Sequence, residues 1–246
     1  MRVGKLDSDY QTSSESRTEL DSHADVTVVG KNALVLTDFN RPVTVTGYNP
    51  ASKPMLNVKT VGAAIAYDDP TTGATIMLTI HQALHIPTLE HNLLCPMQYR
   101  VNQVLVNDVS KFLIDKPSND DHAIIVDSKE NGPTRIPLSL TGIVSYFPSR
   151  KPTLEEYESC EVHYELTSET PEWNPAISTF ANQESSMTDS RGLIPESPLT
   201  DRHSPKFRQI CHLRFDPYHP EEQDLATALS RNHSTSNCQE TTMVRH

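Results

Sequence analysis

The sequence predicts an all-β domain followed by a polar tail. Short runs of β-branched residues alternate with turn residues between about residues 20 and 150, and strands at this spacing are typical of a sandwich or a barrel. The clearest pair of runs is 58–67 and 74–80, joined by a turn that contains Pro70 and Gly73. A Pro/Gly turn between two apolar runs favours a β-hairpin.

Further strands are expected on both sides of that hairpin. They are expected at 26–29, 42–46, 103–106, 123–126, 135–140 and 143–147. One short helical or turn-like segment is predicted at 92–99, where Pro96 suits the first turn of a helix.

Changes in composition divide the chain into four segments. Residues 1–18 and 151–246 are polar, with too little apolar surface to offset the entropy lost on ordering, so both are expected to be mostly disordered. Between them we expect a compact domain over 19–103 and a β-rich extension over 104–150. The acidic stretch 154–164 is the part of the tail where a short helix is expected.

Charge and hydropathy exclude several classes of partner. The formal net charge is −11 and the pI is about 5.4, and an acidic surface repels the phosphates of nucleic acid. No apolar run approaches the roughly 18 residues of a membrane span, and no apolar signal-peptide core follows the first residues. We therefore expect neither nucleic acid nor membrane as a partner, and a cytoplasmic or nuclear location.

The residues with candidate chemistry are Asp21-Ser22-His23-Ala24. An aspartic protease needs a carboxylate on a tight loop, followed by a hydroxyl residue and a small residue. Two such loops bring two carboxyl groups together, and these share one proton because they cannot both ionise at low cost. One acts as general base on a water, and the other as general acid towards the peptide carbonyl. Alone, the tetrapeptide is also typical of an Asp/Ser turn or a helix cap.

A second motif follows downstream, at residues 83–98. It reads as an apolar strand, a proline, a short loop and then Asn92-Leu93-Leu94 entering a small helix. With the Asp21 motif it resembles the retropepsin-like aspartic protease domain of copia-type retrotransposon polyproteins. The resemblance covers residues 19–103, and the Asp-Ser-His-Ala variant resembles a lineage of such elements in which the similarity continues through 136–140 and 146–148.

The resemblance implies a small closed β-barrel with one catalytic Asp in each chain. Activity then needs a homodimer, in which Asp21 of each subunit forms the dyad and Ser22 makes the hydroxyl contact between subunits. The implied substrate is a polypeptide, bound near Ala24 and Gly47 and covered by a hairpin flap within 47–65. No cofactor is implied.

Some features depart from the family pattern. His23 stands where the family usually has Gly, which tolerates backbone angles that other residues resist. The strand before Asp21 carries Arg17-Thr18-Glu19 in place of apolar residues, and the chain has no zinc knuckle, integrase zinc pattern or reverse-transcriptase-sized region. The alternative function is therefore that of an inactive remnant, a β-domain for dimerisation or peptide binding. An unrelated β-domain is the third interpretation.

A metal site is the other chemistry that these residues could support. Asp21, His23 and Asp25 alternate, so on a strand all three would face one side, and their groups are ligands for zinc. Three histidines follow within 81–91, but their spacing in a strand-like stretch does not make them converge. We expect polar surface histidines and no metal. The four cysteines form no Cys-x-x-Cys pair, which favours free thiols.

Overall fold

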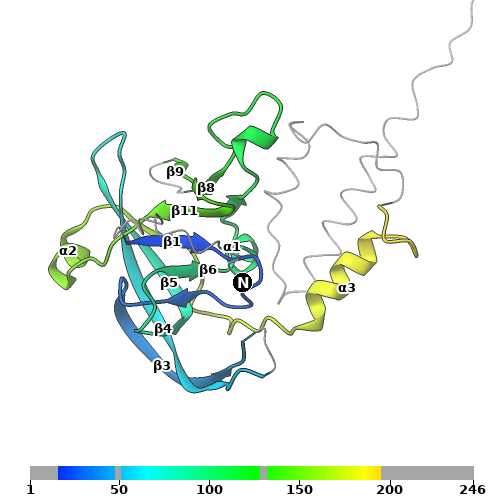
Figure 1. Cartoon of the computed structure of the whole chain (residues 1–246), viewed down its shortest axis with the longest axis horizontal. Helices are drawn as coiled ribbons and strands as arrows, with labels where there is room; N and C mark the ends of the chain where they lie inside the picture. Colours follow the sequence, from blue (N-terminus) through cyan, green and yellow to red (C-terminus); the bar gives the residue numbers. More distant parts are fainter. Residues whose placement is uncertain (1–15, 48–50, 128–131, 195–246) are drawn as a thin grey trace, which may run out of the picture.

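The structure is a computed structural model that describes residues 16–47, 51–127 and 132–194 (Figure 1). Strands dominate these ranges, which confirms the all-β prediction at the level of fold class. The N-terminal segment and the tail are expected to be mostly disordered. Of these segments, residues 1–15 and 195–246 lie outside the described residues.

The described strands form two sheets. The nine strands of the main sheet are β1 Arg17–Leu20, β2 Val28–Val29, β3 Leu34–Val45, β4 Met55–Asp68, β5 Thr75–His85, β6 Asn92–Leu94, β10 Ser139–Thr141, β11 Val144–Pro148 and β12 His163–Glu165. The second sheet contains β7 Leu105–Asn107, β8 Ala123–Val126 and β9 Thr134–Pro137. The helices of the described ranges are α1 Pro96–Val101, α2 Leu154–Ser159 and α3 Ser178–Met187, with a 3-10 turn at Lys111–Leu113.

The order of strands across the main sheet is β10-β11-β1-β6-β2-β5-β4-β3, and β12 pairs with β5. This path is open, so the closed barrel implied by the resemblance is not found among the described strands. One edge of β1 pairs antiparallel with β11, where Thr18 lies opposite Phe147. The path ends at β3 on the other side.

The predicted hairpin is confirmed. β4 and β5 pair antiparallel up to Asp68 and Thr75, and Gly73 takes the left-handed backbone angle that the turn requires (φ +72°). A second, longer hairpin joins β3 to β4. Its tip includes Gly47, with residues 48–50 outside the described ranges.

One core connects the two sheets. Residues 63–67 of β4 are all buried, a continuous run that indicates a strand covered on both faces. Tyr67 packs edge to face against Phe147 of β11, with 6.2 Å between ring centroids. Ile124 and Ile136 of the second sheet belong to the same buried cluster, so the β-rich extension shares the core of the first hundred residues.

The predicted helical segment 92–99 divides into a strand and a helix. Asn92–Leu94 is extended because it pairs with a strand on each side. Pro96 then begins α1, where its missing N–H is no loss. Elsewhere the expected strands at 123–126 and 143–147 correspond to β8 and β11.

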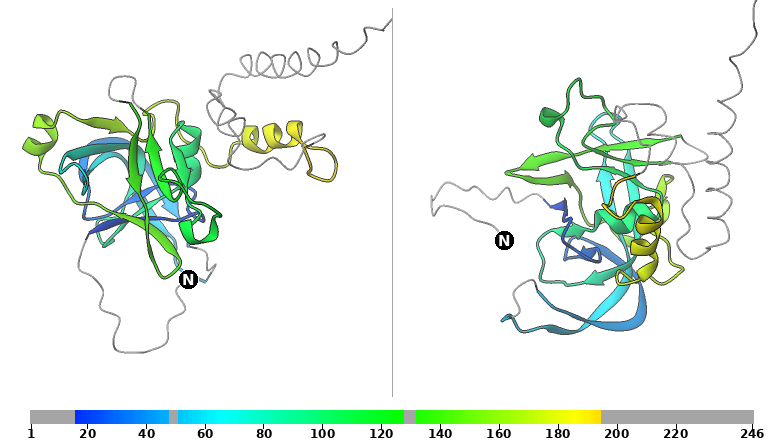
Figure 2. Two further views of the ribbon diagram at one scale, coloured as in Figure 1. Left: turned by 90° about the horizontal axis from the view of Figure 1, so that it is seen from above. Right: turned by 90° about the vertical axis from the view of Figure 1, so that its right-hand side faces the viewer.

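The packed part of the chain extends past residue 151, where the sequence predicted the polar tail to begin. The short helix expected at 154–164 is present as α2, and Thr153 and Glu156 form a capping box at its start. β12 then pairs with β5, and Leu166 is fully buried. The helix α3 projects away from the sheets (Figure 2). No helix within the described ranges is long and apolar enough to span a bilayer.

Candidate active site around Asp21

Asp21 lies on a tight loop directly after β1. Its backbone N–H donates to the carbonyl of Leu94 at 2.9 Å, and its own carbonyl accepts the N–H of Ala24 at 3.2 Å. The first bond ties the loop to β6, and the second closes the turn. The polar residues of β1 do not prevent this arrangement, because Arg17 and Glu19 of this strand pair with each other in a 2.7 Å ion pair.

The two sequence motifs form one structural unit. β6 lies between β1 and β2. It is parallel to β1, with Leu20 opposite Leu94, and antiparallel to β2, with Val28 opposite Leu93. The strand of the downstream motif therefore passes between the two strands that flank the Asp21 loop, and both ends of the loop are fixed to it.

Buried side chains hold the second half of the loop. Thr27 donates its backbone N–H to the amide oxygen of Gln98 at 2.9 Å, and its hydroxyl accepts the N–H of Cys95 at 3.1 Å. Gln98 and Thr27 are each only 1% exposed. Hydrogen bonds in such a low-dielectric interior fix geometry, because breaking one leaves a buried polar group unpaired.

Asn92 of β6 holds the strands on either side. Its side-chain oxygen accepts the N–H of Gly30 at 2.9 Å, and its amide donates to the hydroxyl of Thr18 at 3.2 Å. Thr18 in turn lies 2.8 Å from the hydroxyl of Ser149, just after β11. This chain of hydrogen bonds links β1, the end of β2 and the C-terminal extension, so the extension helps to fix the frame around Asp21.

The carboxylate itself is open to solvent. In the single chain 39% of the Asp21 side chain is exposed, and Oδ1 accepts the backbone N–H of His23 at 2.9 Å. Ser22 and His23 are exposed, and 91% of the His23 side chain is accessible. The imidazole Nδ1 lies 4.0 Å from the carboxylate and 3.5 Å from the Ser22 hydroxyl. The loop thus presents acid, hydroxyl and imidazole on one free surface.

The His23 backbone does not need glycine. Described non-glycine residues with positive φ are Asn40, Asn57, Gln82, Gln103, Lys116 and His122. Because His23 is not among them, the backbone reason for a glycine at this position does not apply to the loop as it is folded here. His23 also supplies its N–H to the carboxylate, as a glycine would.

The other predicted site residues lie in different places. Ala24 is half-buried in the loop beside Asp21. Gly47 is at the exposed tip of the β3–β4 hairpin, and a methyl group added to it would meet no atom within 4 Å. The structure therefore places Ala24 with the candidate dyad residue, and Gly47 on the separate element that overlaps the predicted flap region.

The histidines and carboxylates do not gather at a common point. Within the described residues, no three His, Cys, Asp or Glu side chains are close enough to hold a metal. Asp21, His23 and Asp25 lie in a turn and not in a strand, so their alternation does not place them on one face. His85 is partly buried, and that burial, with the charges of Lys59 and Lys151, lowers its pKa.

One contact of the Asp21 loop that the sequence did not predict comes from the C-terminal segment. The indole Nε1 of Trp173 donates to the carbonyl of Asp25 at 2.9 Å. The only available signal was that Trp173 is the one tryptophan of the chain, which does not by itself predict a contact with the loop. The scattered prolines and Ser/Thr clusters around it, with no apolar period, favour an unstructured segment.

Comparisons with protein-family models, with curated proteins and with solved structures found no match to this chain.

Proposed function

We propose that the chain is a retropepsin-like aspartic endopeptidase of retrotransposon origin, active as a homodimer with Asp21 of each subunit in the dyad. The observation that carries the proposal is the setting of Asp21. Its carboxylate lies on a tight loop after β1 and accepts the backbone N–H of His23. The backbone N–H of Asp21 itself is bonded to Leu94 of β6. A catalytic carboxylate needs such a held position together with an open side.

The chemistry needs a second carboxylate, which a second copy of the chain supplies. Two Asp21 side chains facing each other across a two-fold axis would hold one proton between them. The ionised carboxylate takes a proton from a bound water, whose oxygen attacks the peptide carbonyl, while the protonated one donates to the carbonyl oxygen. When the tetrahedral intermediate collapses, the C–N bond breaks and the amine nitrogen takes the proton that the first carboxylate removed from water. The second carboxylate takes back a proton from a hydroxyl of the intermediate, which restores the shared proton of the dyad.

The exposure of the loop supports this dimer. Ser22 and His23 project from the surface beside Asp21, which is where a twin subunit has to approach. A two-fold interface brings each residue close to its own copy near the axis, so Ser22 of one subunit meets the loop of the other. The twin would remove the two carboxyl groups from water and thereby favour sharing of the proton.

The fold around the loop supports the family assignment. The order of strand, Asp loop, strand, long hairpin, hairpin, short strand and helix follows the chain from β1 to α1. In this proposal the β3–β4 hairpin is the flap, with Gly47 at its tip, and Ala24 lines the substrate site. The substrate is a polypeptide, and the enzyme works in the cytoplasm or nucleus.

The test compares the purified full chain with Asp21→Asn in a peptide-cleavage assay near pH 5. A random decapeptide library serves as substrate, with products identified by mass spectrometry. Asp115→Asn, at an exposed position of the second sheet's loop, is the matched control. Cleavage by the wild type and the control, and its loss in Asp21→Asn, supports the enzyme. A dimeric wild type that cleaves nothing favours the alternative, a β-domain for dimerisation or peptide binding.

A further inference from the structure

Residues 168–174, called here the strap, follow β12 and reach Asp25 of the Asp21 loop through Trp173. Just before it, the hydroxyl of Thr167 accepts the backbone N–H of His81 and donates to its carbonyl, both at 2.8 Å. The N–H of Ser168 then donates to the Asn102 side chain at 2.8 Å. The strap therefore starts from a fixed point next to β5.

Gln82 fixes the path of the strap. Its side chain is buried, and its backbone takes the left-handed conformation (φ +57°) at an irregularity in the β4–β5 pairing. The amide Nε2 lies 3.0, 2.9 and 2.8 Å from the carbonyls of Ser168, Glu169 and Pro171. Its Oε1 accepts the N–H of Trp173 at 2.6 Å. One side chain thus holds both ends of the strap.

The strap contacts both the hairpin that is proposed as the flap and the Asp21 loop. Glu172 forms a 2.9 Å ion pair with Arg41 of β3, the first strand of the proposed flap hairpin. The next residue, Trp173, donates its indole N–H to Asp25 of the Asp21 loop. Because both contacts come from adjacent residues, the strap links the β3–β4 hairpin to the Asp21 loop.

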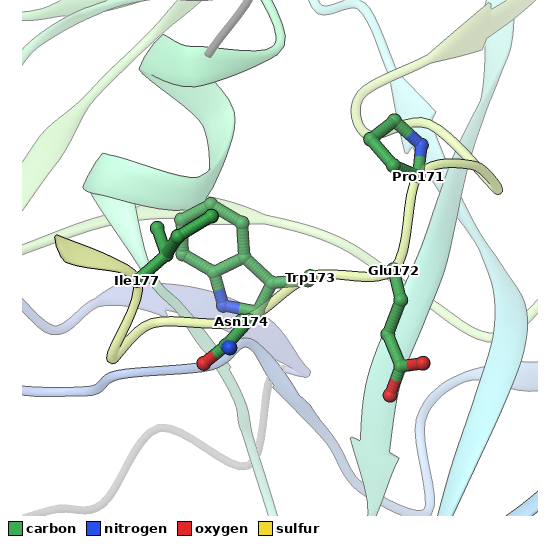
Figure 3. Close-up of a pocket in the computed structure, with 5 residues that line it drawn as sticks. All are labelled: Pro171, Glu172, Trp173, Asn174 and Ile177. Atoms are coloured by element: carbon green, nitrogen blue, oxygen red, sulfur yellow. The ribbon is translucent and has the colours of Figure 1, made fainter. Parts of the chain in front are cut away.

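The strap also forms a shallow pocket. Pro171, Glu172, Trp173, Asn174 and Ile177 line it, and Ile177 lies next to the indole of Trp173 (Figure 3). The ring of Phe180 lies 5.8 Å from that of Trp173. Trp173 and Ile177 are half-buried, so each keeps a face that another apolar side chain can cover.

We infer that the strap is a specificity-determining wall of the peptidase site, and that Trp173 contacts an apolar side chain of the substrate a few residues from the scissile bond. This inference rests on the proposed function. An extended peptide that crosses Asp21 and follows the loop to Asp25 reaches the indole, which is hydrogen-bonded to that residue. A rigid aromatic face beside Ile177 favours a bulky apolar residue over a small or charged one.

The first experiment measures cleavage profiles of the full chain on the decapeptide library. Trp173→Ala should lower kcat/KM for peptides with a bulky apolar residue at the affected position by about tenfold, and leave peptides with Ala there unchanged. Trp173→Phe keeps an apolar ring and should keep the preference. Phe112→Ala, at an exposed aromatic residue of the 3-10 turn Lys111–Leu113, is the matched control. An unchanged profile in Trp173→Ala overturns the inference.

The second experiment uses Trp173 as its own probe, since the chain has one tryptophan. A statine-containing hexapeptide with apolar side chains, whose hydroxyl imitates the hydrated peptide bond, is titrated into the wild type and into Asp21→Asn. Binding should shift the Trp173 emission in both, with weaker affinity in the variant. If the wild type cleaves peptides but the emission does not change, the strap inference fails alone. If it neither cleaves nor binds the probe, the proposed function fails, and the strap inference with it.

Discussion

The side-chain oxygen of Gln98 accepts the backbone N–H of Thr27 at 2.9 Å, although the two residues are 71 positions apart in the chain. Through this bond, α1 holds the strand that leaves the Asp21 loop. The hydroxyl of the same Thr27 accepts the N–H of Cys95 in return. The loop is therefore positioned by the downstream motif as much as by its own residues.

Gln98→Ala should lower the free energy of unfolding by about 2 kcal/mol, because it leaves the buried N–H of Thr27 without an acceptor. Urea denaturation measured by circular dichroism checks this value. Met97→Ala, one position earlier on the exposed side of α1, is the control and should change stability by no more than about 0.5 kcal/mol. Equal effects of the two substitutions would show that the Gln98 bond does not support the fold.

Phe147→Ala should lower the free energy of unfolding by about 3–5 kcal/mol, because it opens a cavity in the core shared by the two sheets. Phe147 is fully buried and packs against Tyr67. Ile143→Ala should have almost no effect, because this residue lies in the turn between β10 and β11 and is 96% exposed. The melting temperature checks both. A small effect of Phe147→Ala would mean that the extension is not part of the core.

Stability should fall as the pH is lowered from 7 to 5, partly through His122. Burial lowers its pKa, and the charge of Lys111 adds to that while Asp108 opposes it. The unfolded chain takes up a proton near pH 6.5, above the folded value, so the stability that His122 contributes is present above that pH and lost below it.

His122→Asn tests this, because Asn tolerates the left-handed backbone at this position (φ +50°) but does not titrate. The slope of unfolding free energy against pH between 7 and 5 should be smaller in this variant than in the wild type. The control is Ile143→Ala, at an exposed position without a titratable group, which should keep the wild-type slope. A slope that His122→Asn leaves unchanged contradicts the assignment.

Ser22→Ala should weaken the dimer without destabilising the subunit. Ser22 is exposed in the single chain, so the unfolding free energy should change by less than about 0.5 kcal/mol. Sedimentation velocity over a range of concentrations should show more monomer than in the wild type. Thr72→Ala, in the turn of the β4–β5 hairpin, is the control, and the same sedimentation behaviour in both variants would argue against a subunit contact through Ser22.

The sequence predicts a strand best where the strand it pairs with is its neighbour in the chain. The β4–β5 hairpin follows from two apolar runs and a Pro/Gly turn, all within one stretch of chain. β6 was predicted as helix or turn, because nothing in Asn92–Leu94 reveals that two distant strands pair with it. The closed barrel was implied by resemblance alone, and the pairing of β1 with β11 could not be read from either segment separately.

The candidate site shows the same division. The sequence predicted Asp21 on a tight turn, and the turn is present. It did not predict that Gln82 binds residues 168–173, since a lone glutamine in a strand carries no signal of its partners. Tertiary hydrogen bonds of this kind join positions far apart in the chain, and local propensity contains no information about them.

Mixing the wild type with Asp21→Asn tests the shared dyad most directly. Equal amounts are unfolded and refolded together, and peptide cleavage is measured per total protein. Because each active dimer needs both carboxylates, random pairing leaves about a quarter of the dimers fully wild type, and cleavage should fall to about a quarter. Activity should follow the square of the wild-type fraction across mixing ratios. A linear dependence, with half the activity at equal amounts, would contradict a dyad built from two chains.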